Sequence, residues 1–358
     1  MESPETKRRI AVGMSGGIDS SVAAALLAEQ GWEVIGLSLH MFKEGSRCCS
    51  IEDVNRARRV ADRLGIRHYV MNVVEDFKEA IVKPFTDEYA SGRTPNPCIF
   101  CNRDFKFGAL MRRALQLGCS HVATGHYVKV EQRADGFHLF RGKDRAKDQS
   151  YFLHRLSQDQ LSKIVFPLGE LTKPEVRAYA AENKIPVEGM SETADLCFIT
   201  AAGPAPLIEQ YHPETARDGD IVDTTGKKLG THRGLHHFTV GQREGLRVAT
   251  GTPMYVKTLD PQTNTVVIGK RPDVMTKTCG VRELFWTTPS PPASGSHIAA
   301  RIRYRTPASP ATISSLASGD WMLDFDEPQF AVAPGQAAVL YDGDEVLGGG
   351  WIERIENR

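Results

Sequence analysis

Strand-like and helix-like segments alternate over residues 1–200, and this order constrains the fold more than any other feature of the sequence. Short apolar runs between turn signals predict strands, and amphipathic segments predict the helices between them. In chain order the segments are RRIAVGM (8–14), SSVAAALLAEQG (20–31), WEVIGLSLHM (32–41), IEDVNRARRVADRLG (51–65), IRHYVMNV (66–73), DFKEAIVKPFTDEYASG (76–92), NRDFKFGALMRRALQLG (102–118) and SHVATGHY (120–127). This order predicts a doubly wound α/β domain, a parallel sheet with helices on both faces. Ligands of such sheets bind beyond the carboxyl ends of the strands.

Near residue 200 the sequence changes to β character. AAGPAPLIEQYHPETARDGD (201–220) is rich in Pro, Ala and Gly, which indicates a connection or a short helix. From Ile221 onward, turns such as DTTG, DPQTN and YDGDE separate short alternating runs, which predicts strands and hairpins. The runs are IVDTTGKKLG (221–230), HHFTVGQREGL (236–246), MYVKTLDPQTNTVVIGK (254–270), HIAARIRYR (297–305), PATISSL (310–316), WMLDFDEP (321–328) and QAAVLYDGDEVLGGGWIE (336–353). This region is long enough for two small β domains.

Composition narrows the class of protein but not its partners. The 358 residues are 41% hydrophobic and 25% charged, with 44 basic and 44 acidic side chains, so net charge favours no partner. No window reaches the ~18 apolar residues of a membrane-spanning helix, and the amino terminus lacks a signal-peptide pattern, which predicts a cytoplasmic protein with no membrane partner. Seven cysteines, an odd number without a secretory signal, argue against a framework of structural disulfides.

The most specific motif is GMSGGIDSS (13–21), between the first predicted strand and the first predicted helix. Gly16 and Gly17 allow the backbone to approach a phosphate group, and N–H groups of the loop and of the helix N-terminus point toward the anion. The serine hydroxyls add donors, and Asp19 is a candidate ligand for Mg²⁺ on the phosphates. A Walker A loop needs a Lys before its final Ser or Thr, and the motif contains neither that Lys nor a GxGxxG fingerprint.

In this setting SGGIDSS resembles the loop of the ATP pyrophosphatases, which split ATP between its α and β phosphates and leave AMP on the substrate. Seven further motifs resemble one branch of that family, the tRNA-specific 2-thiouridylases, and they follow that branch's order over nearly the whole chain. They are GRTPNPCIFCNRDFKF (92–107), ATGHYV (123–128), KDQSYFL (147–153), DLCFI (195–199), GQREGL (241–246), RYR (303–305) and PGQAAVLY (334–341).

This resemblance implies a fold, a reaction and partners. The fold would be an ATP-pyrophosphatase α/β domain over 1–200, a small β-rich domain over 201–272 and a C-terminal β-barrel over 273–358, the last two gripping tRNA. The enzyme would use ATP and Mg²⁺ to adenylate the C2 oxygen of the wobble uridine, and would then replace that oxygen with sulfur from a persulfide donor protein. Adenylation makes chemical sense because an amide-like carbonyl oxygen is a poor leaving group, whereas an adenylated oxygen departs as AMP.

The resemblance also implies roles for individual residues. Cys101 would be the nucleophile and Cys197 would carry the persulfide, the two transiently forming a disulfide. ATP would be bound by Gly13, Met14, Ser15, Gly16, Gly17, Ile18, Asp19 and Ser20, with Leu39 and Gly125 lining the adenosine pocket. The target base would lie against Asn96, Pro97 and Cys98, and tRNA would contact His126, Lys147, Asp148, Gln149, Arg303, Tyr304 and Gln336. From the residues alone, Cys101 lies at the start of a predicted helix, whose dipole favours the thiolate, whereas the apolar neighbours of Cys197 are equally typical of a buried inert thiol.

At Cys98 the sequence departs from the family pattern, because the best-known members carry an aspartate there as a candidate base or orienting group. Acid-base help must then come from elsewhere. Two interpretations stay open. In the first, Cys98 has little consequence and Cys101 performs persulfide chemistry with Cys197. In the second, the three thiolates hold a 4Fe–4S cluster that leaves one iron open to hydrosulfide. Zinc is disfavoured because a closed structural site needs four ligands and the sequence has no second CxxC.

Two other functions are compatible with parts of the sequence. A small-molecule synthetase with the same loop would leave the β-rich half without a use, and no glutaminase-like region accompanies the loop. A non-catalytic RNA-binding protein would not need an intact SGGIDS or both Cys101 and Cys197. Cys48 and Cys49 form a vicinal pair that we interpret as structural or incidental, with a sulfur-relay or metal role as the alternative. Cys119 and Cys279 are interpreted as packing residues.

Overall fold

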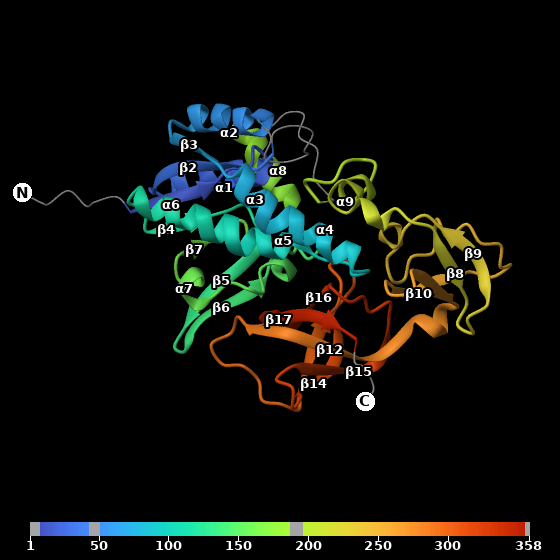
Figure 1. The fold of residues 1–358 in the computed structure, drawn as a ribbon. Coiled ribbons are helices and arrows are strands. Elements are labelled where there is room, and N and C mark those ends of the chain that lie inside the picture. The colour runs from blue at the N-terminus through green and yellow to red at the C-terminus, as the bar shows by residue number, and fades with distance from the viewer. Residues whose placement is uncertain (1–7, 43–50, 187–195, 355–358) are drawn as a thin grey trace, which may run out of the picture.

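The computed structural model describes residues 8–42, 51–186 and 196–354 (Figure 1). Its amino-terminal half is built on five parallel strands in the order β3-β2-β1-β4-β7. These are β1 (Arg9–Gly13), β2 (Glu33–His40), β3 (Arg67–Asn72), β4 (His121–Ala123) and β7 (Ile164–Val165). Because β2 and β4 lie on opposite sides of β1, the loop that follows β1 is at the topological switch point, where open α/β sheets bind their ligands.

Helices cover both faces of this sheet, as the alternation of segments predicted. Along β1, Ile10 and Val12 pack into one apolar core and Ala11 into the other, because successive strand residues point to opposite faces. One face carries α1 (Ile18–Glu29), α2 (Ile51–Leu64) and α8 (Lys173–Glu182); the other carries α3 (Val74–Phe77), η1 (Lys78–Val82), α4 (Lys83–Ala90), α5 (Pro97–Phe100), η2 (Cys101–Ala109) and α6 (Leu110–Gln116). In the part of the chain that the structure describes, no helix has the length and apolar character needed to cross a membrane.

The helix predicted over 102–118 begins earlier than expected. It starts at Pro97 and runs without a break through α5, η2 and α6, so the CxxC lies inside its first turns. Proline is favoured in the first helical turn because its missing N–H would have no partner there. Residues from Cys101 to Ala109 are wound as a π-helix, a rare geometry that is often found at functional sites.

A small central unit follows the connection at residues 201–220. The connection contains α9 (Ala205–Tyr211), as the sequence suggested. The sheet β10-β11-β8-β9 is formed by β8 (Gly219–Val222), β9 (Lys228–His232), β10 (Tyr255–Asp260) and β11 (Thr265–Gly269). One predicted run is wrong: HHFTVGQREGL forms the end of the short helix η5 (Leu235–His237) and an irregular segment. The positive φ angles of Gly241 (87°) and Gly245 (79°) break an extended conformation there.

The carboxyl-terminal strands close into a six-stranded antiparallel barrel, so the predicted architecture is confirmed. Its ring follows the order β12-β15-β14-β13-β16-β17 and closes by pairing β12 with β17. The strands are β12 (Met275–Trp286), β13 (Ser296–Arg301), β14 (Ser309–Ser315), β15 (Trp321–Phe330), β16 (Ala337–Asp342) and β17 (Glu345–Glu353). A hairpin of the α/β unit, β5 (Val128–Arg133) and β6 (Gly136–Arg141), pairs with β17, and barrel residues such as Trp351 share the α/β core. The barrel is thus fixed against the face that carries the CxxC helix (Figure 1).

Candidate active site

The loop between β1 and α1 has the geometry of an anion site. Gly16 has a φ of 74°, and a Cβ atom at this position would lie 2.4 Å from the carbonyl oxygen of Asp53. The backbone N–H of Ser15 donates to the Ser20 hydroxyl at 3.2 Å, which holds the loop over the first turn of the helix. Gly17 is the N-cap of α1 and offers no side chain to the N–H groups of that turn. These donors are therefore available to a phosphate.

The sequence-predicted adenosine residues lie around this loop. A Cβ atom on Gly125 would be 2.6 Å from both Asp19 C and Ser20 N, so the chain after β4 touches the first turn of α1. Leu39 is buried near the carboxyl end of β2, and the N–H of Met14 donates to the carbonyl of Leu37 at 2.8 Å. The structure thus gathers the residues proposed for ATP at one edge of the sheet.

Asp19 is held by two side chains that the sequence analysis did not select. The Lys173 ammonium donates to the two Asp19 carboxylate oxygens at 2.7 Å and 2.8 Å, and the Tyr127 hydroxyl donates to Oδ1 at 2.7 Å. Lys173 is the first residue of α8, and its own N–H donates to an Asp144 carboxylate oxygen at 2.8 Å. A buried ammonium therefore lies beside a loop that lacks a lysine of its own.

Cys98 and Cys101 lie three residues apart on the CxxC helix, so their side chains share one face. Cys98 is half-buried and Cys101 is buried. The barrel holds the segment before this helix, because the Gln336 amide donates to the carbonyl of Thr94 at 2.7 Å and the Thr94 N–H donates to the carbonyl of Pro334 at 3.0 Å. The Gln336 side chain thus holds the segment that precedes the CxxC helix. Its contact with tRNA stays a prediction.

Cys197 lies in a tight turn that is anchored by its neighbour. The N–H of Ile199 donates to the carbonyl of Leu196 at 3.1 Å, so Cys197 and Phe198 occupy the corner. The Phe198 ring packs on Phe85 at 5.0 Å and on Phe77 at 6.0 Å between ring centroids.

Phe77 connects this turn to the CxxC helix. Its ring also packs on Phe105 of η2 at a centroid distance of 5.3 Å. Phe105 lies one turn after Cys101 on the same helix. The segments that carry Cys101 and Cys197 therefore rest on one shared aromatic side chain.

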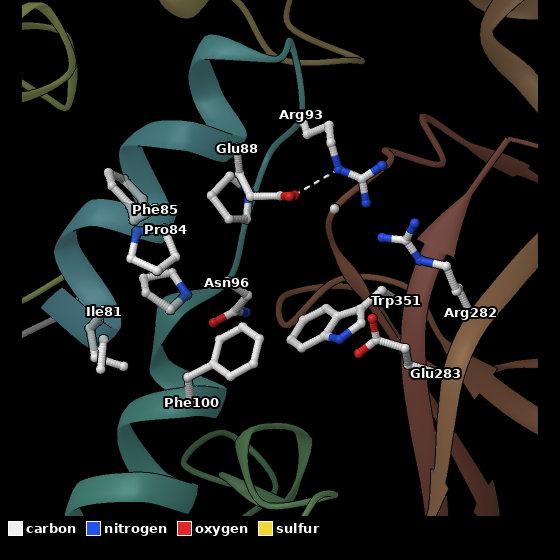
Figure 2. Close-up of a pocket in the computed structure, with 14 residues that line it drawn as sticks. Ile81, Pro84, Phe85, Glu88, Arg93, Asn96, Phe100, Arg282, Glu283 and Trp351 are labelled. Carbon is white, nitrogen blue, oxygen red and sulfur yellow. Dashed lines mark hydrogen bonds and ion pairs between the residues drawn. The ribbon is translucent and has the colours of Figure 1, made fainter. Parts of the chain in front are cut away.

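A pocket with a volume of about 170 Å³ opens between α4, α5 and the barrel. Figure 2 shows Phe100 and Trp351 facing each other in this pocket, and their rings are stacked at 4.8 Å. Asn96 reaches the pocket from the lead-in to the helix and is 9% exposed, while Arg93 stands at its rim in an ion pair with Glu88 at 2.6 Å (Figure 2). The pocket combines aromatic surface, an amide and a guanidinium beside the CxxC, which suits a planar polar ring.

The candidate tRNA residues of KDQSYFL and RYR meet between the α/β unit and the barrel. Asp148 is buried and accepts from the N–H of Ser150 at 3.1 Å and from the Arg301 guanidinium at 3.4 Å. Rings of the two motifs pack together, Phe152 on Tyr304 at a centroid distance of 4.4 Å. Arg303 donates to the carbonyl of Val240 at 2.5 Å.

The same region contains Lys147 and Gln149. The Gln149 side-chain oxygen accepts from the N–H of Tyr127 at 3.1 Å, and Lys147 is half-buried. Several of the residues predicted to contact tRNA thus tie the units together, and their contact with tRNA stays a prediction.

His126 is enclosed by apolar side chains. It is 6% exposed, packs against the rings of Phe107 and Phe166, and shares a 2.6 Å hydrogen bond with the Thr124 hydroxyl. Burial, with a smaller contribution from the charge of Lys106, holds its pKa well below the usual range, so the imidazole is neutral. A contact of this side chain with tRNA would require that cover to open.

The other cysteines divide into two groups. Cys119 and Cys279 are buried, and burial raises the pKa of both thiols, that of Cys279 to about 12, which confirms their interpretation as packing residues. Cys48 and Cys49 lie outside the described residues.

Three family profiles match consecutive parts of the chain. The profile described as a tRNA methyl transferase HUP domain matches residues 8–201, and a tRNA methyl transferase PRC-barrel domain matches residues 206–270. An aminomethyltransferase beta-barrel domain matches residues 276–352. Together they follow the order of the three structural units.

Curated relatives match along almost the whole chain. A tRNA-specific 2-thiouridylase MnmA from Geobacter metallireducens is 43% identical over 98% of this chain and 98% of its own. One from Trichormus variabilis is 44% identical over 98% of this chain and 100% of its own. A solved 4-thiouridine synthetase in complex with RNA and ATP is 18% identical over 58% of this chain and 51% of its own, with a TM-score of 0.36, too remote to add to the assignment. The chain therefore belongs to the family of tRNA-specific 2-thiouridylases, as its motifs predicted.

Proposed function

We propose that this protein is an ATP-dependent enzyme that replaces the C2 oxygen of the wobble uridine of tRNA with sulfur. The observation that carries the proposal is the packing of both cysteine segments on Phe77, in a domain whose glycine-rich loop lies at the switch point of the sheet. The activity named for the full-length relatives supports it. One site would then hold a nucleotide, an extruded base and two thiols.

In the first step the uridine O2 attacks the α-phosphorus of ATP, an O–P bond forms and pyrophosphate leaves. The N–H groups of the loop and the Lys173 ammonium would stabilise the charge that develops on the phosphates. In the ground state Lys173 is held by Asp19, and the approach of a more highly charged triphosphate offers it a competing partner.

In the second step the terminal sulfur of a Cys197 persulfide attacks C2, and AMP leaves with the original oxygen. The Cys101 thiolate then attacks Cys197 Sγ, which forms the Cys101–Cys197 disulfide and releases the sulfur on the base as 2-thiouridine. A thiol reductant supplies the two electrons that reduce this disulfide. A persulfide donor protein reloads Cys197, whose half-buried position in a turn supports such access.

The donor atoms of the site fit two metal groups. The thiols of Cys98, Cys101 and Cys197 are a suitable donor set for a 4Fe–4S cluster, which would supply an iron that binds hydrosulfide. The Asp19 carboxylate would hold Mg²⁺ on the phosphates, because each carboxylate oxygen has two lone pairs and the bond from Lys173 to Oδ2 uses one of them.

Mass spectrometry of nucleosides tests the proposal. The protein is incubated with tRNA, ATP and a sulfide or persulfide source, and we expect 2-thiouridine together with one AMP and one pyrophosphate per modified base. Absence of 2-thiouridine, with AMP formed on a small molecule instead, would overturn it. Iron analysis after anaerobic purification separates the two sulfur routes, since a fully active enzyme without iron excludes the cluster.

We also propose that the chain is organised as units 1–200, 201–272 and 273–358, with the second and third units gripping tRNA. The matches of the three profiles to consecutive segments support this division. The pocket between the first and third units supports a binding mode in which a base leaves its stack and enters beside the CxxC.

A further inference from the structure

Three metal-binding side chains meet where α9 packs on η5. Glu209 of α9 lies with its Oε1 atom 3.0 Å from His236 Nε2 and 3.7 Å from His237 Nε2. One ligand atom from each of the three lies within 4.8 Å of those of the other two, and in the described part of the chain no other group of three or more meets this criterion. None of the three belongs to the site described above.

The spacing matches that of a tetrahedral metal site. With metal–ligand distances of about 2.0 to 2.2 Å, two ligand atoms of tetrahedral zinc are separated by about 3.4 Å. The two His–Glu distances, 3.0 Å and 3.7 Å, lie on either side of that value. The two imidazole rings lie side by side with centroids 4.3 Å apart and planes at 37°, so both present a nitrogen to one carboxylate. Shifts of a few tenths of an ångström would bring both His–Glu distances to that value.

His212 shows why this arrangement differs from an ordinary ion pair. Its Nε2 lies 2.7 Å from Asp87 and its Nδ1 lies 3.0 Å from Glu214, so the two carboxylates occupy opposite edges of one ring. A single metal ion therefore could not be bound by the His212 ring and both of these carboxylates at once. At Glu209, by contrast, two rings converge on one oxygen atom.

Burial gives the cluster a protein side and a solvent side. The His236 side chain is fully buried, whereas His237 is 42% and Glu209 41% exposed. The ring is fixed by the fold, because Gly234 has a φ of 147° and approaches it so closely that a Cβ atom there would lie 2.4 Å from the ring. One ligand is thus positioned in advance, and the open side leaves room for a water molecule as the fourth ligand.

We propose that Glu209, His236 and His237 bind one Zn²⁺ ion that clasps α9 to the central unit. Two neutral imidazoles and one carboxylate are ligands that zinc favours over Mg²⁺ or Ca²⁺, which prefer sets made only of oxygen. α9 also packs against α4 of the α/β unit, so the ion would stiffen the joint between the first two units. The proposal does not depend on the thiolation activity.

Zinc titration of the full chain tests this site. Metal-depleted protein is titrated with Zn²⁺ and followed by calorimetry and thermal unfolding. We expect one high-affinity site outside the cysteines and a rise in unfolding temperature with Zn²⁺. His237→Ala and Glu209→Gln should each weaken this binding at least tenfold. His212→Ala, which alters a histidine of the same region with two carboxylate partners, should leave it unchanged.

Zinc-edge X-ray absorption separates this site from thiol binding. Ligand atoms of nitrogen or oxygen lie at about 2.0 to 2.1 Å from zinc and sulfur at about 2.3 Å. We expect the signal from nitrogen and oxygen ligands to fall in both variants. The proposal is overturned if the wild-type protein binds zinc through sulfur alone, or if His237→Ala and Glu209→Gln bind zinc as tightly as the wild type.

Discussion

The Lys173 ammonium lies 2.7 Å and 2.8 Å from the carboxylate oxygens of Asp19, a residue 154 positions earlier in the chain. This contact connects the first turn of α8 to the phosphate loop, and it places a cation where the loop sequence has none. The capping box of Thr172 and Glu175 fixes the start of α8 and thereby the position of Lys173. The tertiary fold thus places a lysine beside this loop, whereas a Walker A loop has its lysine within its own sequence.

Replacement of Lys173 by Met should lower the rate of AMP formation by about 100-fold, because one charged donor to the phosphates is lost. The measurement is pyrophosphate and AMP release in the presence of tRNA, together with the affinity for ATP. Lys173→Arg should recover part of the rate, since it keeps the charge but changes the geometry of the donors.

Lys143→Ala is the matched control for this prediction. Lys143 pairs with Glu175 at 3.0 Å near the start of the same helix but is exposed and does not touch the loop. Its removal should leave AMP formation unchanged. Wild-type AMP formation in Lys173→Met would mean that Lys173 only supports the structure of the loop.

Gly125→Ala should reduce ATP affinity more than tenfold. The added Cβ atom would meet Asp19 C and Ser20 N at 2.6 Å, and these are backbone atoms that a rotamer change cannot move aside. The strain would push the first turn of α1 away from β4 and cost about 1 to 3 kcal/mol of stability. Equilibrium ATP binding and thermal unfolding measure the two effects. Gly230→Ala, where φ is not positive and the added Cβ atom would meet a side-chain carbon of Val248 at 3.1 Å instead of backbone, separates loss of glycine from loss of this contact.

Local pattern was sufficient to predict the α/β unit as far as β4, but not its later elements β5, β6, β7 and α8. The runs around β1, β2 and β3 are apolar and bounded by turns, and the helices between them are followed by Gly31 and Gly65. The hydrophobic periodicity and the turn residues therefore indicate the same elements. The strand predicted over HHFTVGQREGL was wrong because glycines with positive φ interrupt the run, and a pattern of hydrophobic residues gives no information on φ.

The candidate site was predictable only as far as motifs reached. Gly16 and Cys101 lie inside recognisable motifs, whereas Lys173 and Phe77 act through contacts with distant segments. No local signal in LTKPEVR points to Asp19, since a capping box predicts only that a helix begins there. Such residues become visible only when the sheet brings the ends of its strands together.

Phe198→Ala should slow sulfur transfer without slowing adenylation. The side chain anchors the turn of Cys197 through rings of Phe77 and Phe85, and its loss would free that turn to sample other positions. Because Phe198 is only partly buried, we expect a stability cost of about 2 kcal/mol, below the range for a fully buried ring. Single-turnover assays that follow AMP and 2-thiouridine in parallel measure the two steps.

Phe198→Leu should retain most of the sulfur-transfer rate, because an apolar side chain still fills the site. Equal loss of AMP and 2-thiouridine formation in Phe198→Ala would contradict an anchoring role and indicate general disruption of the site.

His212 should make the joint between α4 and α9 sensitive to pH. Burial alone would lower the pKa of His212, but hydrogen bonds and charges from Asp87 and Glu214 outweigh it, so the pKa lies above its usual value. A raised pKa means that the folded protein binds the proton more tightly than the unfolded chain. The resulting stabilisation is complete below about pH 6.5 and is lost as the pH rises through the raised pKa.

Thermal unfolding of the wild type and His212→Gln between pH 5.5 and pH 8.5 measures this contribution. We expect the variant to be less stable than the wild type by about 0.5 kcal/mol at the acid end, since the pair is partly exposed, and the difference to vanish at the alkaline end. His297→Gln, which alters an exposed pair with Asp326 on the barrel, is the control for a general effect of losing a histidine. A difference for His212→Gln that grows with pH would have the wrong sign and would exclude the charged bridge.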